Sequence, residues 1–371
     1  MDERFFPRLK GDSMKRSPDP LFAPERKQHK TLVFVLLVLA IFLTLLLVLN
    51  HINNSRVNLV TQSVTVPQLN SQMNNFRILH ISDLHGQYFG AQQERLQLAI
   101  REARYDIVVI TGDVTGKGGD DGAFLRLLDL FDGKKPVYFI PGDEDPDPIV
   151  STPNGLNSAK APYILRAEEH GAVYLDAPER LEFGKNAIWL WPEGLYTLDL
   201  GNSEATVATR EAELQSMPAS PERDAQLRAV QYRGELLSRI RAARKITKMD
   251  DVHIAVSHHP LSLSALTTLR EWTDGGNDAY VSSVSLVLSG HYNAGQWRLP
   301  FVGAVKVPAS AGKGGGWFPG DMGVVGLSSY QGIPQYISPG LGASSAIGLP
   351  AFRLFNTPQI TQITLTTKMT Y

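Results

Sequence analysis

The sequence has 371 residues, a formal net charge of −1 and no cysteine. Its length accommodates one large domain with appendages, or two domains of roughly 100–200 residues each. The balanced charge creates no field over the whole chain that would attract nucleic acid, so nucleic acid is not an expected partner. Without cysteine there is no disulfide and no thiolate metal site, which leaves His, Asp, Glu and Asn as metal ligands.

An uncharged apolar run extends from Thr31 to Leu49 near the start of the chain. It meets the threshold of roughly 18 residues for a membrane-spanning helix and exceeds the roughly 7–15-residue core of a cleaved signal. We predict a retained single-pass anchor at 31–49; a buried helix of a soluble protein is the alternative. Lys and Arg residues cluster before this run, whereas only Arg56 closely follows it. The positive-inside tendency therefore predicts a cytoplasmic N-terminus in the cell membrane and an extracytoplasmic location for everything after residue 50.

From residue 76 onward the chain alternates between short apolar runs and helical patterns. The runs ILHIS, DIVVIT and PVYFI are separated by helical stretches around residues 91–104 and 123–131. The later runs AVYL, AIWLW, VHIAV and VSLVLS supply further strands. This order predicts a layered α/β fold with helices on the sheet faces. Upstream, residues 1–30 are predicted to be a disordered tail and residues 50–75 a stalk.

Two stretches interrupt this alternation. Residues 203–247 are predicted to be a helical insert, with Ser220 as the N-cap and Pro221 at the first helical position. Its apolar stripe, expected to be a packing face rather than a lid or a partner site, consists of Leu227, Val230, Leu237 and Ile240. Residues 310–348 are rich in Gly, Ser and Pro. They lack the spacing and the strand-to-helix context of a P-loop, so we expect an irregular surface loop.

The main apolar runs end on polar residues of similar kinds. In chain order these are Asp83, His85, Asp113, Asp143, Glu144, His258, His259, His291 and Asn293. In an open α/β sheet, ligands bind beyond the carboxyl ends of the strands, so these side chains are expected to gather in one place. His80 lies inside its run and is assigned to the core.

Such a group of carboxylates and imidazoles predicts a metal centre. Crowded like charges repel, and no run of Arg or Lys lies nearby to neutralise them, so one or two divalent ions are expected. Oxygen and nitrogen ligands suit Zn, Mn or Fe, and the Asp113 carboxylate could bridge two ions. Two ions would bind a phosphoryl group and lower the pKa of a bridging water, which predicts hydrolysis of a phosphate ester. A solvated turn is the alternative for the acidic segment PGDEDPD at 141–147.

With these motifs the sequence resembles the calcineurin-like metallophosphoesterases, and among them the bacterial membrane-anchored branch. The family pattern is D-x-H, G-D, G-N-H-[DE], H-x-P and G-H-x-H-G-G-Q. The corresponding segments here are DLH, GD, GDED, HHP and GHYNAGQ, the last at 290–296. The likeness covers residues 76–366 except for the insert. It implies a metallophosphoesterase domain folded as a two-sheet β-sandwich flanked by helices.

The resemblance also implies ligands for two ions. One ion would be held by Asp83, His85, Asp113 and Asn293, and the other by Asp113, Asp143, His258 and His291. His259 occupies the variable place of its motif and is expected to lie outside the first layer of ligands or at the surface.

Three positions depart from the family pattern. Asp143 stands where the family has asparagine, and Glu144 and Asn293 stand where it has histidine. An amide oxygen at Asn293 is a weaker donor than imidazole toward Zn or Mn. The resemblance assigns a catalytic role to position 144, on the phosphoryl oxygens or the leaving group. Glu144 could donate a proton there only if burial raised its pKa well above roughly 4.3. Two extra carboxylates would also cancel positive charge that attracts phosphate.

Two functions are therefore expected. The first is a membrane-anchored, metal-dependent phosphoesterase with full or weakened activity on a phospholipid, a cell-envelope component or another extracellular phosphate ester. The second is a catalytically inactive protein of the same fold that binds metal, lipid or a partner.

Overall fold

The computed structural model describes residues 26–271, 284–308, 316–320, 323–330 and 332–367. Most of the tail predicted to be disordered, as well as Lys313 in the Gly-rich stretch, lies outside the described residues. The chain divides into two compact units, Met1–His51 and Ile52–Tyr371.

The N-terminal unit consists, in its described part, of most of helix α1 (Arg26–Asn54). Within residues Lys30–Asn54 of this helix, an 18-residue apolar window has a mean hydropathy of 3.5, and none of that window is buried. Among the described residues it is the one helix long and apolar enough to cross a membrane. Length and composition fit a membrane span or a signal sequence.

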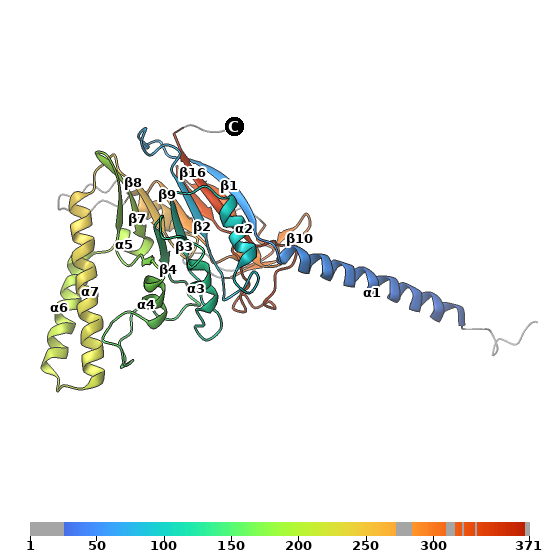
Figure 1. Cartoon of the computed structure of the whole chain (residues 1–371), viewed down its shortest axis with the longest axis horizontal. Helices are drawn as coiled ribbons and strands as arrows, with labels where there is room; N and C mark the ends of the chain where they lie inside the picture. Colours follow the sequence, from blue (N-terminus) through green and yellow to red (C-terminus); the bar gives the residue numbers. More distant parts are fainter. Residues whose placement is uncertain (1–25, 272–283, 309–315, 321–322, 331, 368–371) are drawn as a thin grey trace, which may run out of the picture. The chain divides into compact units, whose positions relative to one another are not determined.

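The second unit contains two six-stranded sheets (Figure 1). The first has the spatial order β1 (Asn58–Thr65), β16 (Gln359–Thr366), β2 (Arg77–Ile81), β3 (Ile107–Thr111), β4 (Val137–Ile140) and β5 (Ala172–Tyr174). Strands β2 to β5 are parallel, β16 is antiparallel to β2, and β1 is parallel to β16. The central strands are apolar on both faces, as is typical of a parallel sheet covered on both sides.

The second sheet has a parallel centre and antiparallel edges. Its order is β14 (Gly326–Tyr330), β15 (Ile333–Ile337), β9 (Leu286–Ser289), β8 (Val252–Val256), β7 (Asn186–Pro192) and β6 (Glu179–Phe183). Strands β15, β9, β8 and β7 run parallel, whereas β14 and β6 close the two edges. The strands predicted from AIWLW, VHIAV and VSLVLS are therefore confirmed.

The two sheets pack face to face, and helices cover their outer faces. Val109, Ile254 and Leu288 belong to a core cluster formed by both sheets. The neighbours of Val109 in β3, Val108 and Ile110, point to the opposite face and pack in the cluster that also contains the helices. This alternation follows from the two-residue period of a strand. The predicted β-sandwich flanked by helices is confirmed.

The outer face of the first sheet is covered by α2 (Glu94–Glu102), α3 (Gly122–Leu128) and α4 (Pro162–Glu169). The second sheet is covered by α5 (Glu193–Tyr196), α7 (Pro221–Ile246) and α8 (Leu263–Glu271). Helix α6 (Leu200–Ser216) packs along α7, and the pair forms a helical hairpin beside the second sheet (Figure 1).

The hairpin corresponds to the predicted insert. The Ser220 side chain accepts a hydrogen bond from the backbone N–H of Arg223, and Pro221 occupies the first turn, as predicted. Leu237 and Ile240 pack on the outer face of the second sheet. The apolar stripe is therefore a packing face in its C-terminal half.

Two sequence-based boundaries are corrected by the structure. Residues 58–65, predicted to be part of a stalk, form β1, which pairs with β16 along its whole length. The segment after it is also buried, because Val66 and Met73 are fully covered. Residues 310–348, predicted to be an irregular loop, contain the β14–β15 hairpin. In both cases strand pairing with a distant segment, β16 for β1 and β9 for β15, outweighs the polar composition.

Candidate metal centre

The carboxyl ends of five strands bring the predicted polar residues together. Asp83 and His85 follow β2, Asp113 follows β3, Asp143 and Glu144 follow β4, His258 follows β8, and His291 and Asn293 follow β9. All nine polar residues identified at the strand ends, His259 included, take part in contacts at this edge of the two sheets. His80, which was assigned to the core, is fully buried in β2 and contacts the Thr111 hydroxyl.

Glycines at the strand ends allow this close approach. A Cβ atom at Gly142 would lie 2.1 Å from the Oδ1 atom of Asp113, and one at Gly290 would lie 2.6 Å from the Oδ2 atom of Asp83. Any larger residue would displace these carboxylates. The glycines that precede Asp143 and His291 are therefore required by space.

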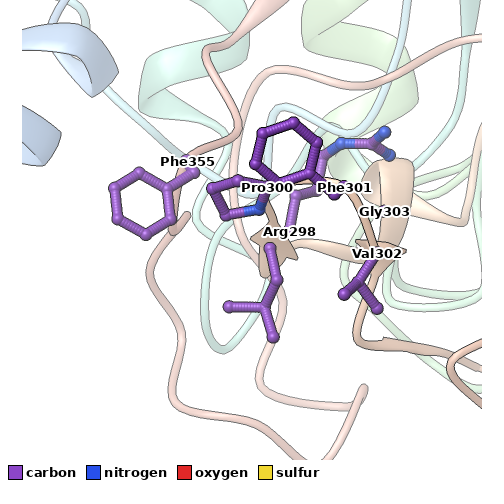
Figure 2. A pocket seen from close by; sticks show the side chains of 7 residues that line it. Arg298, Pro300, Phe301, Val302, Gly303 and Phe355 are labelled. Atoms are coloured by element: carbon purple, nitrogen blue, oxygen red, sulfur yellow. The ribbon is translucent and has the colours of Figure 1, made fainter.

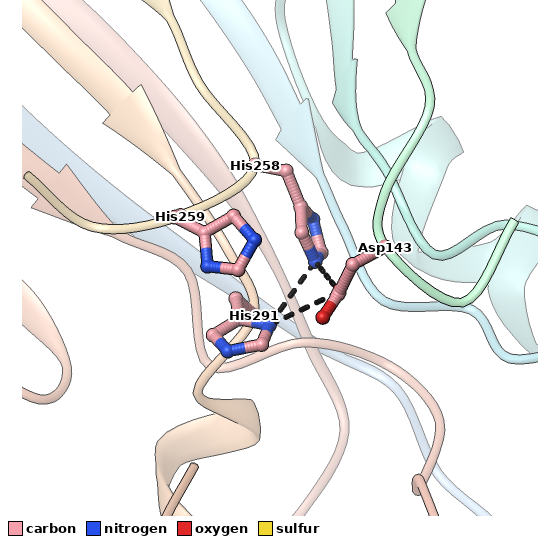
Figure 3. A group of neighbouring side chains, drawn as sticks. All are labelled: Asp143, His258, His259 and His291. Carbon is pink, nitrogen blue, oxygen red and sulfur yellow. Dashed lines mark hydrogen bonds and ion pairs between the residues drawn. The ribbon is translucent and has the colours of Figure 1, made fainter. Parts of the chain in front are cut away.

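His258 is the central residue of the site (Figure 3). Its Nδ1 atom lies 2.8 Å from the backbone carbonyl of Thr111, an acceptor, so Nδ1 carries the proton in the neutral ring. The opposite atom, Nε2, lies 2.8 Å from Asp143 Oδ1, 3.2 Å from Asp113 Oδ2 and 3.2 Å from His291 Nδ1. The Thr111 carbonyl thus orients the ring so that Nε2 faces the other ligands.

His259 lies closer to this group than the sequence indicated. Its ring centroid is 4.1 Å from that of His291, and its buried Nδ1 atom has no hydrogen-bond partner among the described residues. It offers a ligand atom within 4.8 Å of those of Asp143, His258 and His291. The structure therefore adds His259 to the side chains that could contact an ion.

Asp83 and Asn293 each carry a buried oxygen without a partner. Asp83 is fully buried, and its Oδ1 atom accepts a hydrogen bond of 2.8 Å from the His291 backbone N–H. Its Oδ2 atom and the Oδ1 atom of Asn293 have no partner among the described residues. The Asn293 amide nitrogen lies 3.2 Å from His85 Nε2. Buried, unpaired acceptors of this kind are costly unless a cation or a donor reaches them.

Asp113 lies between His258 and the acidic turn. Its Oδ1 atom accepts a hydrogen bond of 2.9 Å from the backbone N–H of Glu144, and its Oδ2 atom is 3.8 Å from His85 Nε2. The Glu144 side chain is 31 % exposed, lies 3.7 Å from His85 Nδ1, and accepts a hydrogen bond from the Ser344 hydroxyl. Glu144 is therefore a hydrogen-bond acceptor in this structure.

Opposing effects set the charges of the central groups. Burial raises the pKa of Asp83 despite the nearby imidazoles. Burial alone would also raise the pKa of Asp113, but the hydrogen bond and charge of His258 lower it below its ordinary value. For His258, burial favours the neutral ring, yet Asp113 and Asp143 raise its pKa well above the ordinary value. Without an ion, the proton on His258 supplies the positive charge that these carboxylates need.

Strained backbone conformations concentrate at the site. Asp83, His85, Asp113, His291 and Asn293 all have φ between 47° and 69°. Residues other than glycine seldom adopt this left-handed region, and Asp, Asn and His tolerate it best. Such strain persists where surrounding contacts enforce it, and it is concentrated at functional sites.

Asp145 holds the acidic turn together, which the sequence alone did not indicate. Its carboxylate accepts hydrogen bonds from the backbone N–H groups of Val114, Thr115 and Gly142 and from the Thr115 hydroxyl, at 2.8–3.2 Å. These bonds join the loops after β3 and β4, which carry Asp113 and Asp143. In the sequence, only the place of Asp145 at the [DE] position of the family pattern G-N-H-[DE] pointed to a distinct role for this residue.

Three buried side chains support the loops from behind. The Arg353 guanidinium donates to the carbonyl oxygens of Pro339, Gly342 and Asn356. The Asn356 amide donates to the carbonyl oxygen of Asn293. Gln296 accepts from the Ser344 backbone N–H and donates to a carbonyl in the same region. Sequence reasoning assigned no role to these residues.

The donor set fits divalent ions. The ligand atoms of Asp83, Asp113 and His258 lie within 4.8 Å of one another, as do those of His85, Asp113 and Glu144. Together with the group around His291, these sets combine carboxylate and imidazole ligands without sulfur, which suits Zn, Mn or Fe. The unpaired oxygens of Asp83 and Asn293 are buried acceptors that a cation would satisfy.

Comparison with known proteins adds independent information. A family model for calcineurin-like phosphoesterases matches residues 76–293. No curated protein matches the chain. Among solved structures, the phosphopantetheinyl hydrolase of Mycobacterium tuberculosis is similar, with 16 % sequence identity and a TM-score of 0.32. That alignment covers 72 % of this chain and 91 % of the hydrolase.

The matched segment contains β2, β3, β4, β8 and β9 and every strand-end residue described above, from Asp83 to Asn293. It spans more than half of the chain. The protein therefore belongs to the calcineurin-like phosphoesterase family.

Proposed function

We propose that this protein is a membrane-anchored phosphoesterase that hydrolyses a phosphate monoester or diester at a centre of two divalent metal ions. The observation that carries the proposal is the convergence of four imidazoles and four carboxylates in ligand groups that share His258 and Asp113. The family relationship supports a metal-dependent hydrolase. Asp113 belongs to two of the three possible ligand groups, which favours a carboxylate shared by two ions.

The proposed ligands are those implied by the family motifs. Asp83, His85, Asp113 and Asn293 would hold one ion, and Asp113, Asp143, His258 and His291 the other. When bound, the ions would neutralise the phosphate oxygens and lower the pKa of a coordinated water.

The protein groups prepare this site in advance. The Thr111 carbonyl fixes the tautomer of His258, and the His291 backbone N–H fixes one oxygen of Asp83. Such outer hydrogen bonds orient ligands and tune their basicity. The backbone N–H of Glu144 does the same for Asp113.

The three departures from the family motif favour weakened activity. Two divalent ions with Asp83 and Asp113 would leave a charge of about +2, and the carboxylates of Asp143 and Glu144 would cancel it. A phosphate would then lose much of its electrostatic attraction. Glu144 is an acceptor for Ser344, so it offers no donor to a phosphoryl oxygen while that bond is made.

The apolar segment of α1 supports a location at the membrane. The basic residues before this segment favour a cytoplasmic N-terminus and an extracytoplasmic active site. The proposed substrates are accordingly phosphate esters of the cell envelope, including phospholipids.

The Ser344–Glu144 bond also favours a second candidate function, a non-catalytic protein that binds metal, lipid or a partner. In that case the acidic turn would hold ions without turning over a phosphate ester. Metal content and turnover measured on the same sample separate the two candidates.

The full-length chain in detergent provides the test. Bound Mn, Fe and Zn are counted, and hydrolysis of a chromogenic monoester and diester is measured beside Asp113→Asn. Metal-dependent turnover that Asp113→Asn abolishes supports the enzyme. Bound metal without turnover in the native chain contradicts catalysis and supports the second candidate.

The triple variant Asp143→Asn, Glu144→His, Asn293→His tests the cause of weak activity. If these residues alone limit catalysis, the variant gains turnover by at least about tenfold, which corresponds to about 1.4 kcal/mol in the barrier. No gain in a variant that binds metal would show that the limitation lies elsewhere.

A further inference from the structure

An apolar surface is exposed on the second unit, at the turn between β10 (Arg298–Leu299) and β11 (Gly303–Ala304). Phe301 at this turn is 110 % exposed, and Leu299, Val302 and Phe355 keep between 38 % and 47 % of their exposure. These four residues, here called the aromatic surface, line one shallow pocket of about 570 Å³ together with Arg298, Pro300 and Gly303 (Figure 2). Contiguous exposed apolar surface of this kind marks an interaction site.

The two phenylalanines of this surface have unfavourable backbone conformations. Phe301 has φ of 65° and Phe355 has φ of 50°, in the left-handed region that bulky residues rarely occupy. Phe301 is fully exposed, so its ring gains no burial in return for this conformation, and Phe355 remains 41 % exposed. A strained backbone that holds an aromatic ring in solvent is better explained by contact with something outside the fold.

The aromatic surface is tied to the end of the apolar helix. The Asn54 side chain, at the last residue of α1, donates a hydrogen bond to the carbonyl oxygen of Arg353, two residues before Phe355. Asn54 is only five residues after Leu49, the end of the apolar run. Even fully extended, five residues reach only roughly 18 Å. If the run spans a bilayer, this part of the second unit must lie at the bilayer surface.

Cationic and indole side chains near this surface suit a membrane interface. Arg56 is exposed directly after α1, and Arg298 lines the pocket. Strand β13 (Gly316–Trp317) pairs with β12 (Lys306–Val307), and the Lys306 amine lies 5.1 Å from the ring centre of Trp317, which is 60 % exposed. Tryptophan is enriched at the headgroup level, where Lys and Arg meet anionic lipids.

We infer that the aromatic surface docks into the bilayer in which α1 is anchored, with Phe301 and Phe355 inserted below the headgroups. The inference rests on the proposed membrane anchoring. Burial of these apolar side chains in the hydrocarbon region favours docking. A surface of this size would not hold the protein at a membrane without the helix, but it would orient a domain already held there.

Docking would place the metal centre close to the lipid surface. Arg298 donates to the carbonyl oxygen of Ala294, next to Asn293, and Asn356, next to Phe355, donates to the carbonyl oxygen of Asn293. One hydrogen bond from Arg298 and one from Asn356 thus connect the region of the aromatic surface to the backbone at the site. This arrangement favours an amphiphilic phosphate ester, presented from the membrane, as the substrate class.

Site-specific labelling of the full-length chain tests the inference, because the protein has no cysteine of its own. Phe301→Cys and Phe355→Cys are each labelled with an environment-sensitive fluorophore and reconstituted into vesicles of phosphatidylcholine and phosphatidylglycerol. Ile246→Cys is the matched control, because Ile246 is also apolar and exposed. It ends α7, at the opposite end of the second unit from β10 (Figure 1). Quenching by spin-labelled lipid is then measured for each label.

We expect labels at 301 and 355 to be blue-shifted and quenched at least about twofold more strongly than the label at 246. Equal, water-like emission at all three positions would overturn docking. A blue shift without quenching by lipid would also overturn it, because a second protein copy would then cover the surface. Flotation with the vesicles reports on the anchor separately: a chain that floats with unquenched labels is anchored but not docked, and a chain that does not float contradicts both proposals.

A charge substitution provides a second measurement. Phe301→Asp should lower the lipid quenching of a label at 355 to the level of the control, whereas Phe301→Trp should preserve it. Unchanged quenching in Phe301→Asp would show that Phe301 takes no part in docking.

Discussion

Replacing Asp145 by alanine should destabilise the domain far more than replacing Asp147, although both belong to the same acidic turn. The Asp145 carboxylate accepts four hydrogen bonds, three of them from backbone N–H groups. Two of those backbone donors belong to Val114 and Thr115, which are buried. Each buried donor left without a partner costs about 1–3 kcal/mol. Asp145→Ala should therefore lower the free energy of unfolding by about 3–5 kcal/mol.

Asp147→Ala is the matched control. Asp147 is exposed, and none of the described residues donates a hydrogen bond to its side chain. Surface substitutions of this kind change stability by less than about 0.5 kcal/mol. Urea unfolding of the full-length chain in detergent, followed by tryptophan fluorescence with chelator present, measures both variants.

The same substitution should weaken metal binding, because Asp145 joins the loops that carry Asp113 and Asp143. Bound metal per chain is therefore measured for both variants at equal ion concentration. Equal stability of Asp145→Ala and Asp147→Ala would refute the reasoning, since it would mean that the four hydrogen bonds contribute nothing beyond those made with water.

Three further outcomes are expected. Metal uptake should release a proton, and metal affinity should rise from pH 6 to pH 8, because the raised pKa of His258 keeps a proton on a proposed ligand. Titration calorimetry in buffers of different ionisation enthalpy measures the released proton. Metal uptake that does not depend on pH would contradict the prediction. Burial lowers the pKa of His80 from 6.5 to about 3, so the buried ring stays neutral where an unfolded chain would take up a proton. The contribution of His80 to the free energy of unfolding is therefore complete above pH 6.5 and is lost as the pH falls toward 3. The loss is roughly 2 kcal/mol between pH 6.5 and 5, and His80→Gln should flatten the acid side of the stability curve by that amount. Arg353→Met should lower the free energy of unfolding by about 3 kcal/mol or more, because three buried carbonyl oxygens lose their donor. A thermal midpoint equal to that of the native chain would contradict this destabilisation.

Local sequence patterns were sufficient for most of the second unit. Strand β3 is apolar up to Thr111 at its end and is buried on both faces, as the run DIVVIT indicated. The N-cap at Ser220 and the proline after it were readable because a helix start depends on neighbours a few residues away. The candidate metal ligands were identifiable because they lie directly after apolar runs.

Other features depend on residues far apart in the sequence. Strand β1 looked like a stalk because its composition is polar, and only its pairing with β16, about 300 residues later, shows that it belongs to the sheet. His259 was assigned to an outer position because its motif place is variable, whereas the ring packs against His291. Asp145 and Asp147 were indistinguishable until the donors near Asp145 were known.

The sequence by itself determined which chemistry is available, because residue types and their places after strands are local properties. It supplied the carboxylates and imidazoles, the apolar helix and the motifs of a family, with three departures from them. The tertiary structure decided which of these groups meet: His258 with Asp113 and Asp143, Glu144 with Ser344, and Asn54 with Arg353. Such contacts arise from packing two sheets face to face, and no periodicity along the chain encodes them.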